Sequence, residues 1–168
     1  MTAVFGDTGR RRELARGLAY WAARSGTLPG QPASKPQAGQ GVAAALARVP
    51  LVPQSDRVNN GNIAQRLAPL QSSAGFAEAV AGLDLDAAPV GDAIAELALL
   101  ACRIFVNEGK RNIALLHGVT GTLSLRSFAP FLDAAQLKLG LAFAFQNVAA
   151  FYAIRVRRTA LEQSTPRR

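Results

Sequence analysis

The residues with the most potential for chemistry lie in one short stretch, residues 113–126, which contains the only histidine of the chain. Read as a helix, this stretch carries one face of polar and small residues. That face consists of His117, Thr120, Gly121 and Ser124. An imidazole beside hydroxyl groups can donate a hydrogen bond or a proton, and a glycine lets a ligand approach closely. His117 is therefore either a functional group or a core imidazole with hydrogen-bond partners.

Two further polar residues are candidates for the same site. Arg126 lies nine residues after His117, which places it on the opposite side of a straight helix. The two converge only if the helix bends or breaks near Gly118 or Gly121. Gln146 lies in a later apolar run, where it either faces the same cavity or needs other hydrogen-bond partners.

The composition predicts an all-α fold. Hydrophobic residues make up 49% of the 168 residues and charged residues only 18%, which favours a globular core. Alanine and leucine dominate, β-branched residues are sparse, and no strand pattern or internal repeat appears. We predict a single domain, residues 1–168, built as an irregular multi-helix bundle with six or seven helices and its core helices within residues 89–158.

The order of the elements follows from caps and breakers. A first helix should run to about Ser25, and residues 27–41, rich in Pro and Gly, should form an irregular, mobile linker that packs least well. Short helices are expected at 42–48 and 61–70, with another capped by Ser72 or Ser73. A core helix over 93–108 and a last helix beginning with an Asp133–Gln136 capping box should flank the helix of His117. We expect His117 to line a cavity there.

Several classes of function are excluded by what the sequence lacks. One histidine and the single Cys102 provide no usual zinc or haem ligand set, so no metal is expected. No glycine-rich dinucleotide or P-loop motif appears, so we expect no tightly bound flavin. The net charge is +8, but the arginines gather at the two ends of the chain, so we expect no nucleic-acid partner.

Residues 137–156 are the one candidate for a membrane span. They contain Lys138, Gln146 and Asn147, which are costly in lipid, so a buried core helix is expected instead. The N-terminus has no signal-peptide core. We therefore expect a cytoplasmic protein with no membrane partner.

Three segments resemble, in the same order, segments of the questin oxidase-like family. The first is residues 19–24 with 28–30, and the second is Leu-His-Gly-Val-Thr-Gly at 116–121, running on to 125–126 and 129–132. The third is the late helix with Gln146, Ala149, Ala150 and Tyr152. Together these segments span nearly the whole chain, which resembles the C-terminal portion of the longer family members.

The resemblance implies an oxidoreductase that uses NADPH for a Baeyer–Villiger-type oxygen insertion into a small aromatic polyketide ketone. His117 would then be a hydrogen-bond donor or general acid toward the carbonyl oxygen, and Arg126 would hold developing negative charge. Thr120, Gly121 and Ser124 would bind the substrate, with Gln146 facing the same cavity. Histidines of the family's N-terminal half have no counterpart here, so a truncated or inactive remnant is expected.

The alternative is a non-catalytic helical module that associates with another chain. The apolar faces of helices 93–108 and 133–155 exceed what the short N-terminal helices can cover. On this interpretation, a homo-oligomer or a partner chain covers the exposed apolar helices.

Overall fold

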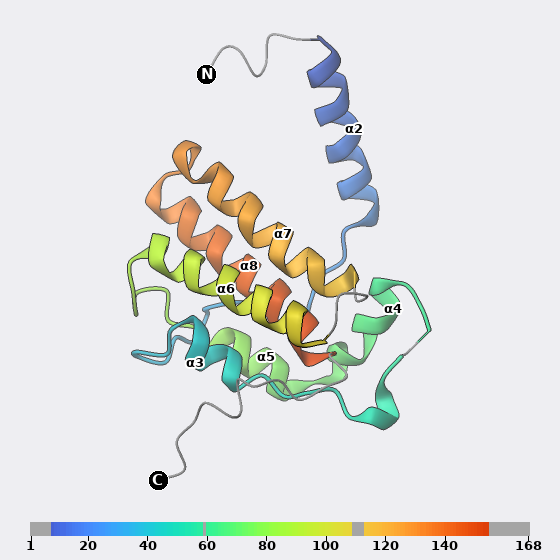
Figure 1. The fold of residues 1–168 in the computed structure, drawn as a ribbon, viewed down its shortest axis with the longest axis vertical. Coiled ribbons are helices and arrows are strands. Elements are labelled where there is room, and N and C mark those ends of the chain that lie inside the picture. Colours follow the sequence, from blue (N-terminus) through green and yellow to red (C-terminus); the bar gives the residue numbers. More distant parts are fainter. Residues whose placement is uncertain (1–7, 59, 109–112, 155–168) are drawn as a thin grey trace.

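The computed structural model describes residues 8–58, 60–108 and 113–154, and within them every regular element is a helix (Figure 1). The α-helices are α2 (Thr8–Arg24), α3 (Val42–Ala47), α4 (Ile63–Leu67), α5 (Ala74–Ala81), α6 (Val90–Glu108), α7 (Ile113–Phe128) and α8 (Ala134–Ala153). Three short 3-10 helices are η1 (Gln54–Asp56), η2 (Ala68–Ser72) and η3 (Ala129–Phe131). The predicted all-α, multi-helix single domain is confirmed.

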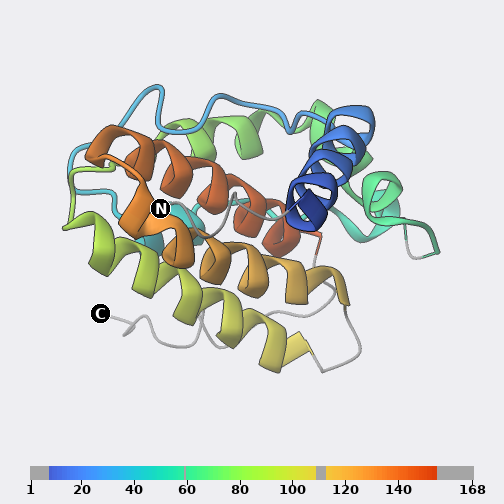
Figure 2. The same ribbon diagram turned by 90° about the horizontal axis from the view of Figure 1, so that it is seen from above.

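The core is a bundle of the three long helices α6, α7 and α8, which lie side by side (Figures 1 and 2). Helix α7 packs against both others, as predicted, but α6 and α8 also contact each other, so α7 does not separate them. Helices α3 and α5 close the bundle against α6 and α8 respectively. The largest fully buried side chains are Leu46, Leu70, Phe76, Leu83, Leu97, Ile104, Leu141 and Phe145.

Small residues set the close contact between α7 and α8. A Cβ atom added at Gly118 would lie 3.6 Å from both Phe151 and Val148, and one added at Gly140 would lie 2.6 Å from Leu125. The second distance is shorter than any real Cβ contact, so Gly140 gives the Leu125 side chain its space. The contact therefore includes one glycine from each helix, Gly118 of α7 and Gly140 of α8.

Local capping fixes where the helices begin. The Asp133 carboxylate accepts a hydrogen bond from the Gln136 backbone N–H at 2.8 Å, and the Gln136 side chain accepts one from the Asp133 N–H at 3.0 Å. This is the predicted capping box. Asn62 and Gln65 form a second box at α4, and Ser73 caps α5, as predicted for that serine pair.

The segment at residues 27–41 was expected to pack least well, and that prediction is wrong. Its backbone N–H groups at Ala33, Lys35 and Gln37 donate to the carbonyls of Val80, Ala81 and Gly82, at 3.0–3.1 Å. The last carbonyls of a helix have no partner within that helix, so this segment satisfies the end of α5. The segment lacks regular structure but is held in place by hydrogen bonds.

The turn at Asp84 holds the far end of the same segment. Its carboxylate accepts hydrogen bonds from the backbone N–H of Asp86 at 2.9 Å and of Gly39 at 2.8 Å. These two bonds, Asp86 first, together with the positive charge of Lys138, lower the pKa of Asp84 below its usual 3.8. The carboxylate form of Asp84 is therefore part of the fold, beyond the solvated turn predicted for this position.

Helix α2 is the element that packs least. It begins and ends as the sequence predicted, but each of its side chains whose placement the structure describes is exposed. The helix stands clear of the bundle and has no more than slight contact with any other described element (Figure 1).

No helix within the described residues is long and apolar enough to cross a membrane. The described part of the candidate span, in α8, instead buries Leu141, Phe145 and Tyr152 in the core.

Replacing Gly30 with Ala should destabilise the fold by about 2 kcal/mol. Gly30 has a φ of +82°, which favours glycine, and an added Cβ would lie 2.8 Å from the Ala77 Cα. Gly91→Ala is the matched control, because nothing lies within 4 Å of its added Cβ. That change should be neutral or stabilise by up to about 1 kcal/mol. Urea unfolding measures both, and equal effects would contradict the proposed contact of Gly30 with α5.

Candidate functional site

The structure does not bring His117 and Arg126 together. Helix α7 is continuous from Ile113 to Phe128, without a break at either glycine. Nine residues of α-helix separate the two positions by half a rotation and about 13 Å along the axis. Both side chains are exposed. The convergence that a shared catalytic site needs is therefore absent from this structure.

His117 lies on the outer side of α7, so the prediction that it lines a cavity is wrong. The inward face of α7 is a different one, made of residues that are mostly small. Its buried residues are Ala114, Leu115, Gly118, Val119 and Thr122. Small side chains let α7 approach α6 and α8 closely, so packing favours this face over the one with the histidine.

The hydroxyl groups of the predicted site donate to the backbone of their own helix. Thr120 Oγ1 donates to the Leu116 carbonyl at 3.2 Å, and Ser124 Oγ donates to the Thr120 carbonyl at 2.8 Å. Both bonds reach back four residues, as serine and threonine commonly do within helices. Neither hydroxyl proton is therefore directed at a ligand.

The two remaining predicted residues have structural surroundings. Gly121 is exposed and lies against α8, where an added Cβ would be 3.6 Å from Asn147 Nδ2. Gln146 is buried, and its Nε2 donates to the carbonyls of Pro29 and Gly30 at 3.1 and 2.9 Å. Gln146 therefore anchors the irregular segment to α8.

The hollows of the surface lie elsewhere. One of about 510 Å³ lies between α4 and α8, and the only polar side chains at its wall are those of Thr27, Gln71 and Asn147. Its apolar wall comes from Leu28, Ile63, Ala64, Leu67 and Ala68. None of the predicted site residues lines it.

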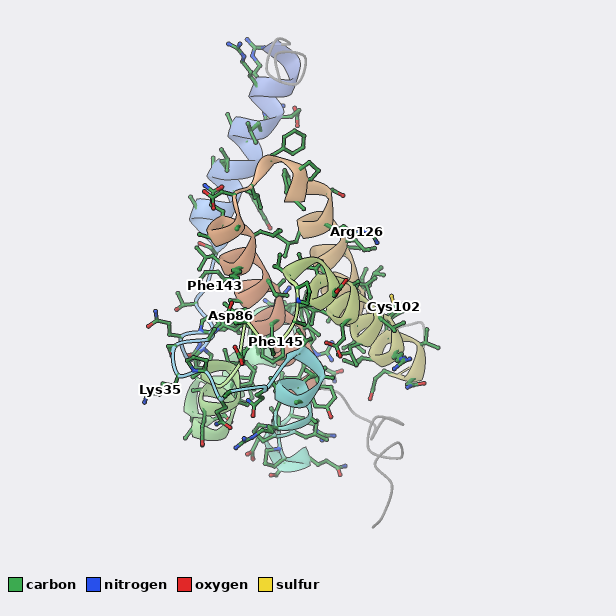
Figure 3. All side chains as sticks on the ribbon, turned by 90° about the vertical axis from the view of Figure 1, so that its left-hand side faces the viewer. Lys35, Asp86, Cys102, Arg126, Phe143 and Phe145 are labelled. Carbon is green, nitrogen blue, oxygen red and sulfur yellow. The ribbon has the colours of Figure 1, made fainter. Side chains whose placement is uncertain are left out.

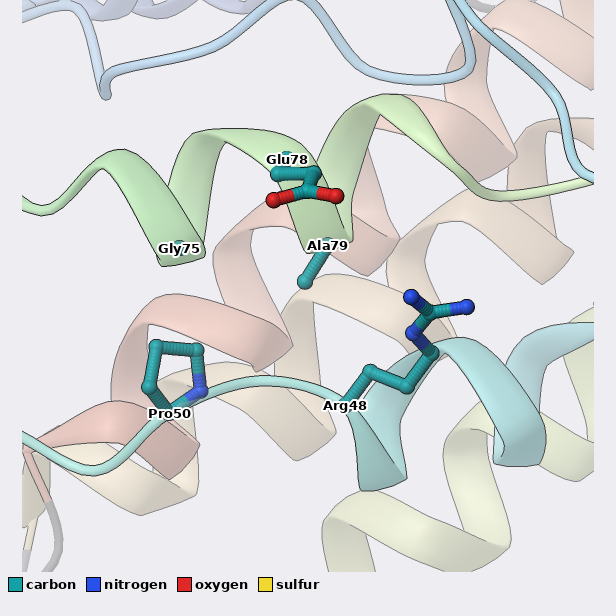
Figure 4. A pocket seen from close by; sticks show the side chains of 5 residues that line it. All are labelled: Arg48, Pro50, Gly75, Glu78 and Ala79. Atoms are coloured by element: carbon teal, nitrogen blue, oxygen red, sulfur yellow. The ribbon is translucent and has the colours of Figure 1, made fainter.

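A smaller hollow of about 150 Å³ lies between the end of α3 and α5. Arg48 and Glu78 stand on its facing walls (Figure 4). The Arg48 guanidinium donates to the side-chain oxygen of Gln40 at 2.9 Å and also to that of Gln37. The hollow is smaller than the roughly 300–1,000 Å³ of small-molecule sites, so we assign these charges to the fold.

Within residues 8–58, 60–108 and 113–154, no three His, Cys, Asp or Glu side chains gather where they could hold a metal ion. No buried arginine or lysine is found there to bind the phosphates of a nucleotide.

The most prominent uncovered surface is the outer side of α6 and α7, which we call the α6–α7 face. On α6 it is formed by Leu99, Cys102 and Val106, at the spacing i, i+3, i+7, and on α7 by Leu116 and Leu123, two turns apart. Val119, between the two leucines, is buried and belongs to the core. Cys102 of α6 and Arg126 of α7 point outward on this side of the molecule, away from Phe145 in the core (Figure 3).

The α6–α7 face exposes large apolar side chains that the fold leaves uncovered. Leu99, Val106, Leu116 and Leu123 have exposed fractions between 37% and 63%. Helices α6 and α7 are the most extensively packed pair, so the two helices that carry these side chains are direct neighbours. The sequence carried the signal for this face, since each helix has a second apolar stripe beside its core stripe.

Comparisons with protein-family models, with curated proteins and with solved structures found no match to this chain. The questin oxidase-like resemblance therefore stays a prediction, and the function has to be inferred from the geometry of the chain.

The sequence predicted that Gly121→Leu would destabilise the fold more than a change at Thr122. The burial of α7 indicates the opposite order for these two neighbouring positions. Thr122 is 1% exposed, and its hydroxyl donates to the Gly118 carbonyl. Thr122→Leu should therefore cost about 1–3 kcal/mol by overpacking. Gly121→Ala should stabilise the exposed side of the helix by up to about 1 kcal/mol. Thermal unfolding of both variants measures the two changes in stability. A larger loss of stability at Gly121 than at Thr122 would contradict the assignment of Thr122 to the buried face of α7.

Proposed function

We propose that this chain is a non-catalytic helical module that associates with another chain through the α6–α7 face. The observation that carries the proposal is the set of large apolar side chains on the neighbouring helices α6 and α7 that no part of the described chain covers. Water contact with a contiguous apolar surface is unfavourable, and surfaces of this kind mark interaction sites.

The α6–α7 face has the composition of a binding surface. Its centre is apolar, and the exposed polar residues at its border include Arg103, Thr120 and Arg126. An apolar centre with a polar rim in which arginine is frequent is typical of protein interfaces. Full burial of one leucine-sized side chain is worth roughly 1.5–3 kcal/mol, and these side chains, about half exposed in the single chain, would each contribute about half of that on association.

The same face on a second copy is the occupant that the structure offers. Two antiparallel helices with matching stripes are self-complementary about a two-fold axis. Their apposition gives a four-helix layer, the arrangement in which i, i+3, i+7 stripes are ordinarily buried. With 16 and 19 residues, α7 and α6 present stripes of similar length along the contact.

The chain should form a concentration-dependent dimer, and the double variant Leu99→Gln/Leu123→Gln should be monomeric. The changes remove one large apolar side chain from each stripe at positions that are exposed in the single chain, so its stability should change little. Leu139→Gln/Phe143→Gln on α8 is the matched control, because it removes two exposed apolar residues outside the α6–α7 face. Sedimentation equilibrium of the three proteins measures the association.

Cys102 provides an independent readout, since it is the only cysteine and lies in the α6 stripe. Its alkylation rate should fall as the protein concentration rises. A wild-type chain that stays monomeric, with alkylation independent of concentration, would contradict the second copy as occupant. If the control variant is as fully monomeric as the Leu99/Leu123 variant, the dimer contact lies on α8 and not only on the α6–α7 face.

The oxidoreductase activity implied by the family resemblance can be tested separately. The isolated chain should not consume NADPH with an anthraquinone and oxygen, because His117 and Arg126 are exposed and far apart. Oxygen-insertion products by mass spectrometry, formed by the wild-type chain and lost in His117→Ala, would support the oxidoreductase and overturn the non-catalytic interpretation.

A further inference from the structure

Helix α2 has properties that the α6–α7 face does not explain. It is 17 residues long, and those of its side chains that the structure describes are exposed, including Leu14 and Leu18 at 49% and 52%. Isolated helices of this length are marginally stable in water, and most gain stability by packing an apolar stripe. A helix that stands clear of its own bundle while carrying such a stripe is suited to packing against something outside the chain.

From position 12 onward the charged and apolar residues of α2 lie on different sides. Leu14 and Leu18 fall on one side of the helix by their spacing. Arg12 and Arg16 fall on the opposite side, where Arg16 also pairs with Glu13 at 2.8 Å. Five arginines against one glutamate give Thr8–Arg24 a net charge of +4. The partner of α2 therefore has to be anionic and has to offer an apolar layer beside its charge.

We infer that α2 is an interfacial helix that lies flat on an anionic lipid surface. A bilayer with acidic headgroups presents negative charge and hydrocarbon within one side-chain length, which matches exposed leucines on a helix with arginines on its opposite side. Arg11, in the first turn, lies nearer the apolar side, from which a long side chain can extend back to the headgroups. The inference is independent of the proposed association, since it uses no residue of the α6–α7 face.

Lipid fits α2 better than nucleic acid does. A helix that binds only phosphates needs arginines and gains nothing from a leucine stripe on the opposite side. A helix that lies on a lipid surface does not have to cross the bilayer, and none of the described helices can cross one. The prediction of no membrane partner rested on the lack of a spanning helix, so it does not bear on surface binding by α2.

Trp21 makes the experiment specific, because it is the only tryptophan of the chain and reports on α2 alone. The full chain should float with vesicles of phosphatidylcholine containing about one third phosphatidylglycerol and not with phosphatidylcholine alone. Its tryptophan emission should shift to shorter wavelength in the same samples. Raising the salt concentration should weaken binding, since the charge attraction is screened.

Two pairs of variants separate the contributions. Leu14→Gln/Leu18→Gln should lower vesicle affinity at least tenfold and abolish the emission shift, whereas Leu139→Gln/Phe143→Gln should retain both. Arg12→Gln should lower affinity severalfold, whereas Lys35→Gln, which removes the same charge at an exposed position outside both α2 and the α6–α7 face, should change it less. Circular dichroism of each variant confirms that the helices are intact.

Flotation lost equally in both leucine and control variants, or flotation without a tryptophan shift, would overturn the proposal. A tryptophan response to single-stranded polyuridylate with none to anionic vesicles would assign α2 to nucleic acid and overturn it as well. If the α6–α7 variant Leu99→Gln/Leu123→Gln floats as well as wild type, the lipid contact does not depend on association.

Discussion

The close packing of α7 against α8 is the contact on which the rest of the structure depends. Gly140 leaves room there for the Leu125 side chain, which an added Cβ would meet at 2.6 Å, and a Cβ added at Gly118 would already touch Val148 and Phe151 at 3.6 Å. Dispersion and burial reward close approach over a large area, so the small-residue side of α7 turns inward. The rotation of α7 that this contact sets also decides which of its other side chains reach solvent. His117 and the apolar stripe of the α6–α7 face are both outside for this one reason.

The α6–α7 face and helix α2 then follow as two uncovered apolar surfaces of different chemistry. The α6–α7 face is apolar at its centre and is carried by the most extensively packed helix pair, which makes it a firm platform for another helical surface. Helix α2 carries a net charge of +4 and stands on its own. A rigid apolar platform is suited to protein, and a separate basic amphipathic helix is suited to an anionic surface. The two proposed contacts use different residues, so each can be tested by its own variants.

Local sequence signals predicted the fold class and most helix ends, because caps act over three or four residues. The Asp133–Gln136 box and Ser73 are examples in which the pattern alone defines the hydrogen bond. The inward face of α7 was not predictable in this way, since both of its sides carry leucines and only the partners on α6 and α8 distinguish them. The order of residues 27–41 was missed for a similar reason, because their hydrogen-bond partners lie at the end of α5, about fifty residues later.

The interior of the bundle gives the final reason to look for function at the surface. Within the described residues, the buried polar side chains are Gln40, Thr122 and Gln146. Each is already hydrogen-bonded: Gln40 to the Gly82 carbonyl and Arg48, Thr122 to its own helix, and Gln146 to the irregular segment. A buried ligand site needs polar groups whose hydrogen bonds remain to be made, because those groups provide the orientation and specificity of binding. These three side chains specify the fold instead, so recognition falls to the surface, where the α6–α7 face and α2 are the two sites that we propose.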